Sequence, residues 1–328
     1  MLYLPNDSTD PYFNLALEET IFSMADPAET YLLLWQNSPS VIIGKHQNTL
    51  AEINSGYISR QGIKVVRRMT GGGAVYHDLG NLNYSFIQPG GGQSAPDFET
   101  FTRPVVAALA KLGATVEFSG RNDLTLAGKK ISGSAQCIRG GKILHHGTLL
   151  FAVDLERLET ALTPDPEKIA SKGVASVRSR VTNISDHLTR RMSVAAFKAT
   201  LLACLAAEQP LTTRPLAAAE LAAAASLADS RYRSWDWIYG QSPPANIRRS
   251  KRFAAGKLEA WLDVAAGRVR AAAFYGDFFS AGDPAAVAAA LTGLRYERRE
   301  LAAALAAFDI AAYFSGMSGD DVLAVLID

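Results

Sequence analysis

Hydrophobic and polar positions follow two different periods along this chain, and together they predict both helices and strands. Residues 11–24 space their apolar side chains as a helix does, and the segment opens with proline, which is favoured in a first helical turn. Residues 31–35 and 41–43 are short aromatic or β-branched runs separated by Asn37-Ser38-Pro39, which predicts strand, turn and strand. We therefore expect a helix followed by the beginning of a sheet.

Further strands are predicted at residues 64–66, 82–87, 115–118 and 148–153, and a helix at residues 97–112. The helix begins at a capping aspartate and ends at a glycine. The strands and helices do not alternate regularly, as they would in a doubly wound fold. The pattern favours an α+β domain, or mixed-sheet α/β domain.

The pattern changes at residues 234–244, where an aromatic run is followed by a pair of prolines. Beyond it, residues 253–264 and 269–278 flank Ala266-Gly267 and predict a hairpin, and Asp283-Pro284 starts an Ala-rich helix. We predict two domains, one over residues 1–244 and a small α+β domain over residues 249–328. The Ala-rich residues 216–227 indicate a plain helix, because alanine is the best helix former.

Composition narrows the class of protein. The chain has 33 Lys and Arg against 32 Asp and Glu, so its formal charge is +1, and no overall field would draw it to nucleic acid or to an anionic membrane. No apolar run approaches the ~20 residues needed to span a bilayer. Two cysteines are too few for a disulfide framework. We expect a folded cytoplasmic protein.

The glycine triplet at residues 71–73 is the first candidate for chemistry. Glycines let the backbone approach a ligand closely and present N–H groups to it, and Arg67 and Arg68 add charge that suits phosphate. A flexible hairpin with solvated arginines explains the same composition equally well. Because neither the P-loop nor the dinucleotide-binding fingerprint is present, any ATP site here would be of another kind.

A second polar stretch contains Asn122, Asp123 and Lys130 among small residues. A lysine beside a phosphate can offset the charge of both an attacking carboxylate and the α-phosphate, and Asp123 can bind Mg²⁺. These properties suit acyl-adenylate formation. Taken alone, a polar hairpin with surface lysines is the simpler interpretation of the stretch.

Three other features have both a structural and a functional interpretation. His145 and His146 precede the predicted strand at residues 148–153, and adjacent residues on a strand point to opposite faces, which favours structural roles over a shared metal. His77 is either a buried hydrogen-bonded residue or part of a site. Arg178 lies in the polar, basic residues 168–183, which form either a mobile lid over phosphates or a solvated loop.

Several segments together resemble the motifs of the lipoate-protein ligase A family, in that family's order, over nearly the whole chain. They are Phe13–Glu19, Arg67–Asn81, Gly120–Asp123, Lys130–Ala135, His145–Leu149, Ser176–Asn183 and Ser234–Trp237. The resemblance implies a catalytic domain like that of biotin protein ligases and class II aminoacyl-tRNA synthetases, followed by a small accessory domain.

The resemblance also implies an activity. Lipoate and ATP, with Mg²⁺, would give lipoyl-AMP and pyrophosphate. A lysine of a lipoyl domain would then attack the mixed anhydride and become lipoylated. The implied acceptors are the lipoyl domains of 2-oxoacid dehydrogenase complexes and the H protein of glycine cleavage.

The family's site residues transfer to this sequence by motif. Arg68 and the run from Gly73 through Ala74 and Val75 to Tyr76 would contact ATP, and Lys130 would be catalytic, touching the lipoate carboxylate and the adenylate phosphate. Further nucleotide-binding candidates are Arg67, Gly72, His77, Asn122 and Arg178. Asp123 is the candidate magnesium ligand.

Two rival functions remain open. An ATP-independent octanoyl or lipoyl transferase would pass the acyl group through a cysteine thioester, for which Cys137 is the candidate. A non-catalytic lipoate- or adenylate-binding module is the other, although the presence of Lys130 and Asp123 argues against a decayed active site.

Overall fold

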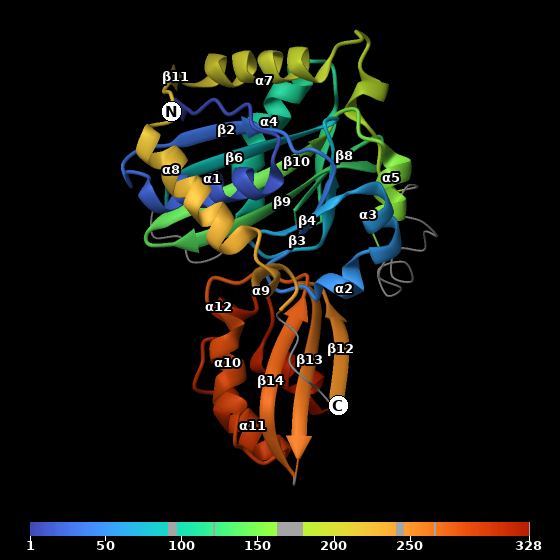
Figure 1. The fold of residues 1–328 in the computed structure, drawn as a ribbon, viewed down its shortest axis with the longest axis vertical. Coiled ribbons are helices and arrows are strands. Elements are labelled where there is room, and N and C mark those ends of the chain that lie inside the picture. The colour runs from blue at the N-terminus through green and yellow to red at the C-terminus, as the bar shows by residue number, and fades with distance from the viewer. Residues whose placement is uncertain (91–96, 121, 163–179, 241–245, 266, 328) are drawn as a thin grey trace.

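A computed structural model describes residues 1–90, 97–120, 122–162, 180–240, 246–265 and 267–327. Figure 1 shows two units, a larger one built around a wide sheet and a smaller one below it built around a three-stranded sheet. The short helices α2 (Thr49–Glu52) and α9 (Trp235–Ile238) lie near the junction between the units. Within these ranges, no helix is long and apolar enough to cross a membrane.

The larger unit contains an eight-stranded mixed sheet. Its β1 strand is parallel to both neighbours, and the other neighbouring pairs are antiparallel. In spatial order the strands are β11 (Thr212–Thr213), β1 (Leu2–Tyr3), β2 (Tyr31–Trp35), β6 (Asn81–Pro89), β10 (Lys142–Leu150), β9 (Lys129–Arg139), β8 (Asp123–Leu126) and β7 (Val116–Ser119). The mixed sheet expected from the irregular order of helices and strands is confirmed.

Helices cover both faces of this sheet. The remaining helices of the unit are α1 (Pro11–Met24), α3 (Ser55–Gln61), α4 (Phe98–Lys111), α5 (Leu155–Ala161), η2 (Ile184–His187), α7 (Val194–Glu208), α8 (Ala218–Leu227) and η3 (Ala228–Tyr232). Figure 1 shows α4 and α7 together at one side of the sheet and α1 and α8 at the other.

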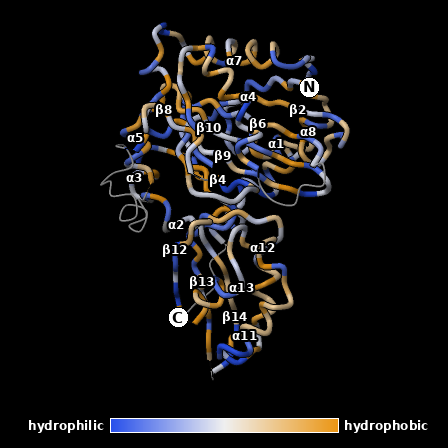
Figure 2. Tube along the Cα trace, turned by 180° about the vertical axis from the view of Figure 1, so that it is seen from behind, coloured by the Kyte–Doolittle hydropathy of each residue, from blue (hydrophilic) through white to orange (hydrophobic). Residues whose placement is uncertain are grey.

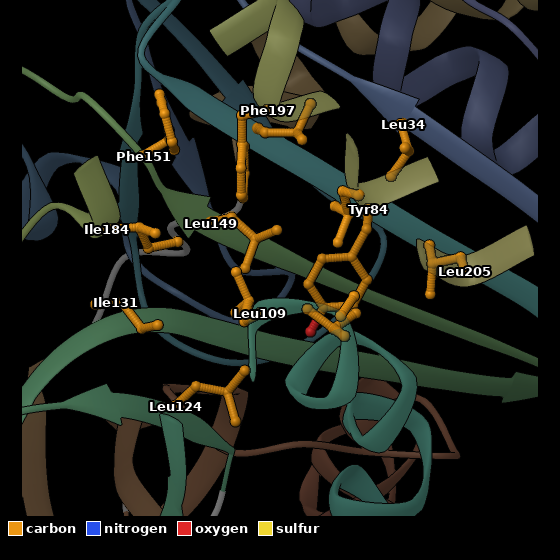
Figure 3. Close-up of a cluster of buried hydrophobic side chains, with 14 of the residues drawn as sticks. Leu34, Tyr84, Leu109, Leu124, Ile131, Leu149, Phe151, Ile184, Phe197 and Leu205 are labelled. Atoms are coloured by element: carbon orange, nitrogen blue, oxygen red, sulfur yellow. The ribbon is translucent and has the colours of Figure 1, made fainter. Parts of the chain in front are cut away.

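Period-2 alternation explains why both faces are apolar. Leu32 and Leu34 of β2 join the core beneath α4 and α7, whereas Leu33 between them joins the core beneath α1 and α8. Figure 3 shows the first of these cores, where Leu149 and Tyr84 from the sheet lie near Leu109 of α4 and Phe197 of α7. In a sheet that is covered on both faces, the sequence of each strand is a nearly continuous apolar run, as in β2.

A second, smaller sheet in the same unit has the order β4-β3-β5, with β4 (Lys64–Arg67), β3 (Ser40–Ile43) and β5 (Val75–His77). The central strand β3 is parallel to β4 and antiparallel to β5. Segment 68–74, which contains the glycine triplet, therefore crosses one end of this sheet. The sequence had predicted that the next strand after the triplet begins at residue 82, so the short strand β5 was missed.

The smaller unit packs β12 (Ile247–Phe253), β13 (Gly256–Ala265) and β14 (Arg268–Gly276) against four helices. The helices are α10 (Pro284–Leu291), α11 (Arg298–Leu305), α12 (Ile310–Tyr313) and α13 (Gly319–Ile327). Its core cluster draws its members from residues 247–327 alone. The predicted hairpin is confirmed as β13 and β14, and the predicted Ala-rich helix as α10.

Two strands departed from the apolar pattern. The edge strand β12 was not predicted because four of its seven residues are Arg or Lys, and its trace is mostly hydrophilic in Figure 2. Basic residues are typical of sheet edges, where they discourage pairing with another chain. The strand predicted at residues 148–153 is the end of β10, which begins at Lys142. Its first half was missed because His145 and His146 interrupt the apolar run.

Candidate active site

The glycine loop, residues 71–73, packs closely against the end of strand β3 in the small sheet. A Cβ on Gly44, just past β3, would lie 1.9 Å from the Gly72 carbonyl oxygen, so the loop can approach only a glycine there. Gly72 itself has φ of +90°, a conformation that side chains disfavour. Gly73, Ala74 and Val75 are partly exposed. These three residues therefore form the accessible rim of the loop.

Arg68 organises this loop from within. Its Nη2 donates to the carbonyl oxygens of Gly71 at 2.6 Å and Gly73 at 2.9 Å, and its Nε donates to Thr70 Oγ1 at 3.0 Å. Its Nη1 donates to Ile42 O at 3.3 Å. Burial lowers the pKa of Arg68 to about 10, so the guanidinium is still charged at neutral pH. The charge lies directly under the glycine loop.

Arg67 has a different environment, although the sequence had grouped the two arginines. Its guanidinium is 1% exposed and donates from Nη1 to the carbonyls of residues 44, 45 and 47. Its Nε donates to Trp237 O, and its Nη2 donates to Thr49 Oγ1 and Ile238 O. All five N–H groups are thus used. The prediction that Arg67 contacts a nucleotide has no support in this geometry, because Arg67 joins two protein segments instead.

Tyr76 and His77 of β5 are also buried. The Tyr76 side chain packs in a core cluster, and burial raises its pKa to about 12. His77 Nδ1 lies 3.0 Å from Asn37 Nδ2 and accepts from it. Burial, with the charges of Arg68 and His146, lowers the His77 pKa to about 3. His77 is neutral at physiological pH.

The second polar stretch lies on the β8–β9 hairpin. Lys130 Nζ and Asp123 Oδ1 form an ion pair at 2.7 Å, and both side chains are partly exposed. Gly133 faces Asp123 across the hairpin, and a Cβ there would lie 2.9 Å from Lys130 Nζ, so the glycine leaves room for the lysine. Asn122 Nδ2 donates to Ser134 O at 2.6 Å, which fixes the start of β8. A lysine and a carboxylate are thereby presented side by side.

A phenylalanine from the smaller unit contacts both the glycine loop and strand β9. The ring of Phe279 would be 3.2 Å from a Cβ on Gly72, and it also packs against Phe98 and Ala135. Ala135 belongs to β9, the strand of Lys130. The fold therefore places both the glycine loop and strand β9 against one ring. The sequence offered no signal for Phe279, because nothing local marks an inter-unit contact.

The smaller unit has other contacts with the same region. Gly72 N donates to Phe278 O at 3.2 Å, and Gly276 N donates to His46 O at 2.8 Å. The His46 ring stacks on Phe278 with centroids 4.9 Å apart, and its Nε2 lies 2.7 Å from Ser280 Oγ. The contact is therefore made by backbone hydrogen bonds as well as by aromatic stacking.

His145 and His146 face opposite sides of β10, as the alternation of a strand requires. His145 Nδ1 lies 2.9 Å from Gln136 Nε2, and its ring stacks on Phe101. His146 contacts Glu18 and Thr70 instead. Among the described residues, no group of three or more His, Cys, Asp or Glu could hold a metal ion. A magnesium site at Asp123 stays a prediction.

Arg178 and Cys137 are the other two residues for which the sequence predicted a role in the site. Arg178 lies outside the described residues, so its role as part of a lid stays a prediction. Cys137, the candidate for a thioester, is a free thiol packed against a core cluster, and burial raises its pKa. A thiol whose pKa is raised by burial is a poor nucleophile at neutral pH.

Comparison with known proteins identifies the family. The family model for the lipoyl protein ligase A/B catalytic domain matches residues 10–206, and that for the bacterial lipoate protein ligase C-terminus matches residues 242–326. The lipoate-protein ligase LplJ of Bacillus subtilis is 42% identical, over 98% of this chain and 99% of its own. Lipoate–protein ligase 1 of Staphylococcus aureus is 38% identical, over 98% of both chains.

Solved structures agree with these relatives. P. falciparum LipL1, in complex with lipoate, shares the fold over 94% of both chains, with a TM-score of 0.78 at 22% identity. A lipoate-protein ligase A bound with ATP is 28% identical, with a TM-score of 0.63 over 73% of this chain and 98% of its own. Because family models and nearly full-length relatives coincide, the chain belongs to the lipoate-protein ligase family.

Proposed function

We propose that this protein activates lipoate with ATP and transfers the lipoyl group to a lysine of a lipoyl domain. One observation carries the proposal: Phe279 lies beside the Arg68-supported glycine loop and also packs against Ala135 on β9, the strand that carries Lys130 and its partner Asp123. Membership of the lipoate-protein ligase family supports the choice of lipoate. A related structure bound with ATP supports the choice of nucleotide.

In this reaction the substrates supply the nucleophiles, and the protein supplies positioned positive charge. A lipoate carboxylate oxygen attacks the α-phosphorus of ATP, the bond to pyrophosphate breaks, and lipoyl-AMP forms. The ε-amine of the acceptor lysine then attacks the acyl carbon, an amide forms, AMP leaves and a proton is released. The first step brings a carboxylate and a polyphosphate together, and the second expels anionic AMP, so fixed cations at the reacting phosphate lower both barriers.

We assign roles to the chain's own residues on this basis. Lys130 would contact the lipoate carboxylate and the α-phosphate, offsetting charge on both. The accessible backbone of Gly73, Ala74 and Val75 would bind ATP phosphates, with the positive charge of Arg68 behind it. The remaining nucleotide candidates are Gly72, Tyr76 and His77 near the loop, Asn122 beside Asp123, and Arg178.

We further propose that Asp123 is the protein ligand of Mg²⁺. Magnesium is commonly held by one or two carboxylates together with substrate phosphates, so a single carboxylate fits this role. Bound there, the ion would neutralise phosphate charge. Asp123 forms an ion pair with Lys130. When the nucleotide and the ion bind, this pair would open, so that Asp123 holds Mg²⁺ and Lys130 holds the α-phosphate.

The acceptor and the domain limits are also proposals. A Thermoplasma acidophilum structure described as a bipartite lipoate protein ligase and its E2 lipoyl domain is 29% identical, with a TM-score of 0.65. It supports a lipoyl domain as acceptor, and we propose the lipoyl domains of 2-oxoacid dehydrogenases and the glycine cleavage H protein. Separate core clusters support domains at residues 1–244 and 249–328. We expect the reaction to occur in the cytoplasm, where free thiols such as Cys137 and Cys204 stay reduced.

The experiment is to incubate the purified protein with lipoate, ATP and Mg²⁺ and to measure pyrophosphate and lipoyl-AMP, with octanoate and biotin as alternative acids. Lys130→Ala should slow lipoyl-AMP formation about 100-fold or more. The matched control is Lys129→Ala, because Lys129 is the exposed neighbour on the same strand. Thioester on Cys137 without pyrophosphate release would instead establish the transferase.

A further inference from the structure

A continuous chain of buried polar groups leads from the middle of the large unit to Arg68. Trp35 Nε1 donates to Ser85 Oγ at 2.9 Å, and Ser85 Oγ donates to Glu18 Oε1 at 2.5 Å. Glu18 Oε2 lies 2.8 Å from His146 Nδ1, and His146 Nε2 lies 2.8 Å from Thr70 Oγ1. Thr70 Oγ1 then accepts from Arg68 Nε. Five separate parts of the fold, β2, β6, α1, β10 and the loop after β4, thus meet in one chain.

The hydrogen bonds determine which atom carries each proton. Because Thr70 Oγ1 accepts from Arg68 Nε, its own hydrogen is available for His146 Nε2. His146 then carries its proton on Nδ1 and donates it to the Glu18 carboxylate. Hydroxyl, imidazole and carboxylate are therefore arranged in the order of a hydrolase triad, but here the hydroxyl is occupied by an arginine.

Burial explains why such a chain is needed. Glu18 is 1% exposed and Arg68 is 6% exposed, and an unpaired buried charge is costly. The two charges are not in direct contact, since His146 and Thr70 lie between them. The carboxylate nonetheless favours the charged form of the guanidinium. A network in which every member has a partner also rigidifies its surroundings.

We propose that Glu18, His146 and Thr70 act as a positioning relay that sets the orientation of the Arg68 guanidinium, and with it the phosphate-binding shape of the glycine loop. The proposal rests on the proposed function, because it concerns the ATP half of the same site. None of the three residues needs to touch the reacting atoms. Their effect should appear in the handling of ATP.

The test compares substitutions that change one hydroxyl. Thr70→Val removes the hydroxyl and keeps the shape, whereas Thr70→Ser restores it. The control is Thr102→Val, because Thr102 is an equally buried threonine, bonded only within α4. Binding of ATP with Mg²⁺ is measured by calorimetry, KM for ATP and for lipoate by pyrophosphate release, and folding by thermal unfolding.

We expect Thr70→Val to weaken ATP binding about tenfold or more, as loss of a hydrogen bond to a charged group does, with the KM for lipoate unchanged. Thr70→Ser should restore most of the ATP affinity. Thr102→Val should lower the thermal stability and leave ATP binding unchanged. Normal ATP binding in folded Thr70→Val would overturn the relay. Failure of the wild-type protein to form any acyl-AMP would overturn the proposed function instead.

A double-mutant cycle tests whether Glu18 belongs to the relay. If Glu18 acts through Thr70, then Glu18→Gln and Thr70→Val should have effects on ATP affinity that do not add, because the second change breaks a chain already broken. Additive effects, or an effect of Glu18→Gln confined to the KM for lipoate, would show that Glu18 acts separately and would overturn its place in the relay.

Discussion

At the scale of single residues, two adjacent arginines have separate functions. Arg67 ends β4 and bonds to carbonyls of the segments around residues 44–47 and 237–238, whereas Arg68 turns into the glycine loop. The sequence predicted that basic residues stand beside the loop. It did not predict which of them supports the loop, because that depends on segments 20 and 170 residues away.

Replacing Arg67 by lysine tests its structural role. Lysine cannot supply the planar set of five donors, so buried carbonyls of both segments would lose their partners. We expect Arg67→Lys to lower the free energy of unfolding by about 3–5 kcal/mol, measured by urea denaturation. Arg60→Lys, at an exposed position in α3, should change it by less than about 0.5 kcal/mol. Unchanged stability with loss of ATP binding would make Arg67 a ligand contact after all.

At the scale of elements, the glycine loop is both a candidate phosphate site and a contact for the smaller unit. The sequence predicted the loop correctly, because consecutive glycines are a local signal. It did not reveal the second role, since Phe278 and Phe279 look like ordinary core residues at the end of a strand. Glycine serves both roles for one reason, which is that its backbone can be approached closely.

Substituting Gly71 separates these roles. A Cβ on Gly71 would lie 2.4 Å from Phe278 O, and because that neighbour is backbone it cannot rotate away. We expect Gly71→Ala to weaken the contact between units by about 1–3 kcal/mol and to raise the radius of gyration seen by small-angle scattering. In the control Gly56→Ala the nearest atom is the end of the Arg60 side chain at 3.4 Å. Identical scattering for Gly71→Ala and wild type would refute the prediction.

At the scale of the whole molecule, buried histidines link stability to pH. Burial lowers the pKa of His46, His77 and His145 well below the usual 6.5. Below about pH 6.5 these histidines therefore bind protons in the unfolded chain but stay neutral in the folded protein. Stability is fully retained above that pH and falls as the pH decreases, by about 1.4 kcal/mol per unit for each such histidine.

His145 provides the sharpest test of this linkage, because its ring lies against the aromatic rings of Phe98 and Phe101 on α4. We expect the free energy of unfolding, measured in urea at pH 7.5, 6.5 and 5.5, to fall with decreasing pH. His145→Gln should reduce that dependence by the contribution of one histidine, about 1.4 kcal/mol over the last unit. His187→Gln, at an exposed position, is the control. An unchanged pH dependence in His145→Gln would contradict the prediction.

The sequence by itself determined the features that depend on neighbours along the chain. Apolar periodicity defined α1, β2 and the β13–β14 hairpin, and the glycine triplet and Lys130 motifs defined the two halves of the candidate site and its family resemblance. Tertiary structure alone decided that Arg67 bonds to two distant segments, that Glu18 and His146 lead to Arg68, and that Phe279 packs against both the glycine loop and β9. The reason is physical: periodicity and steric freedom are local, whereas the partner of a buried charge is chosen by how sheets and units pack.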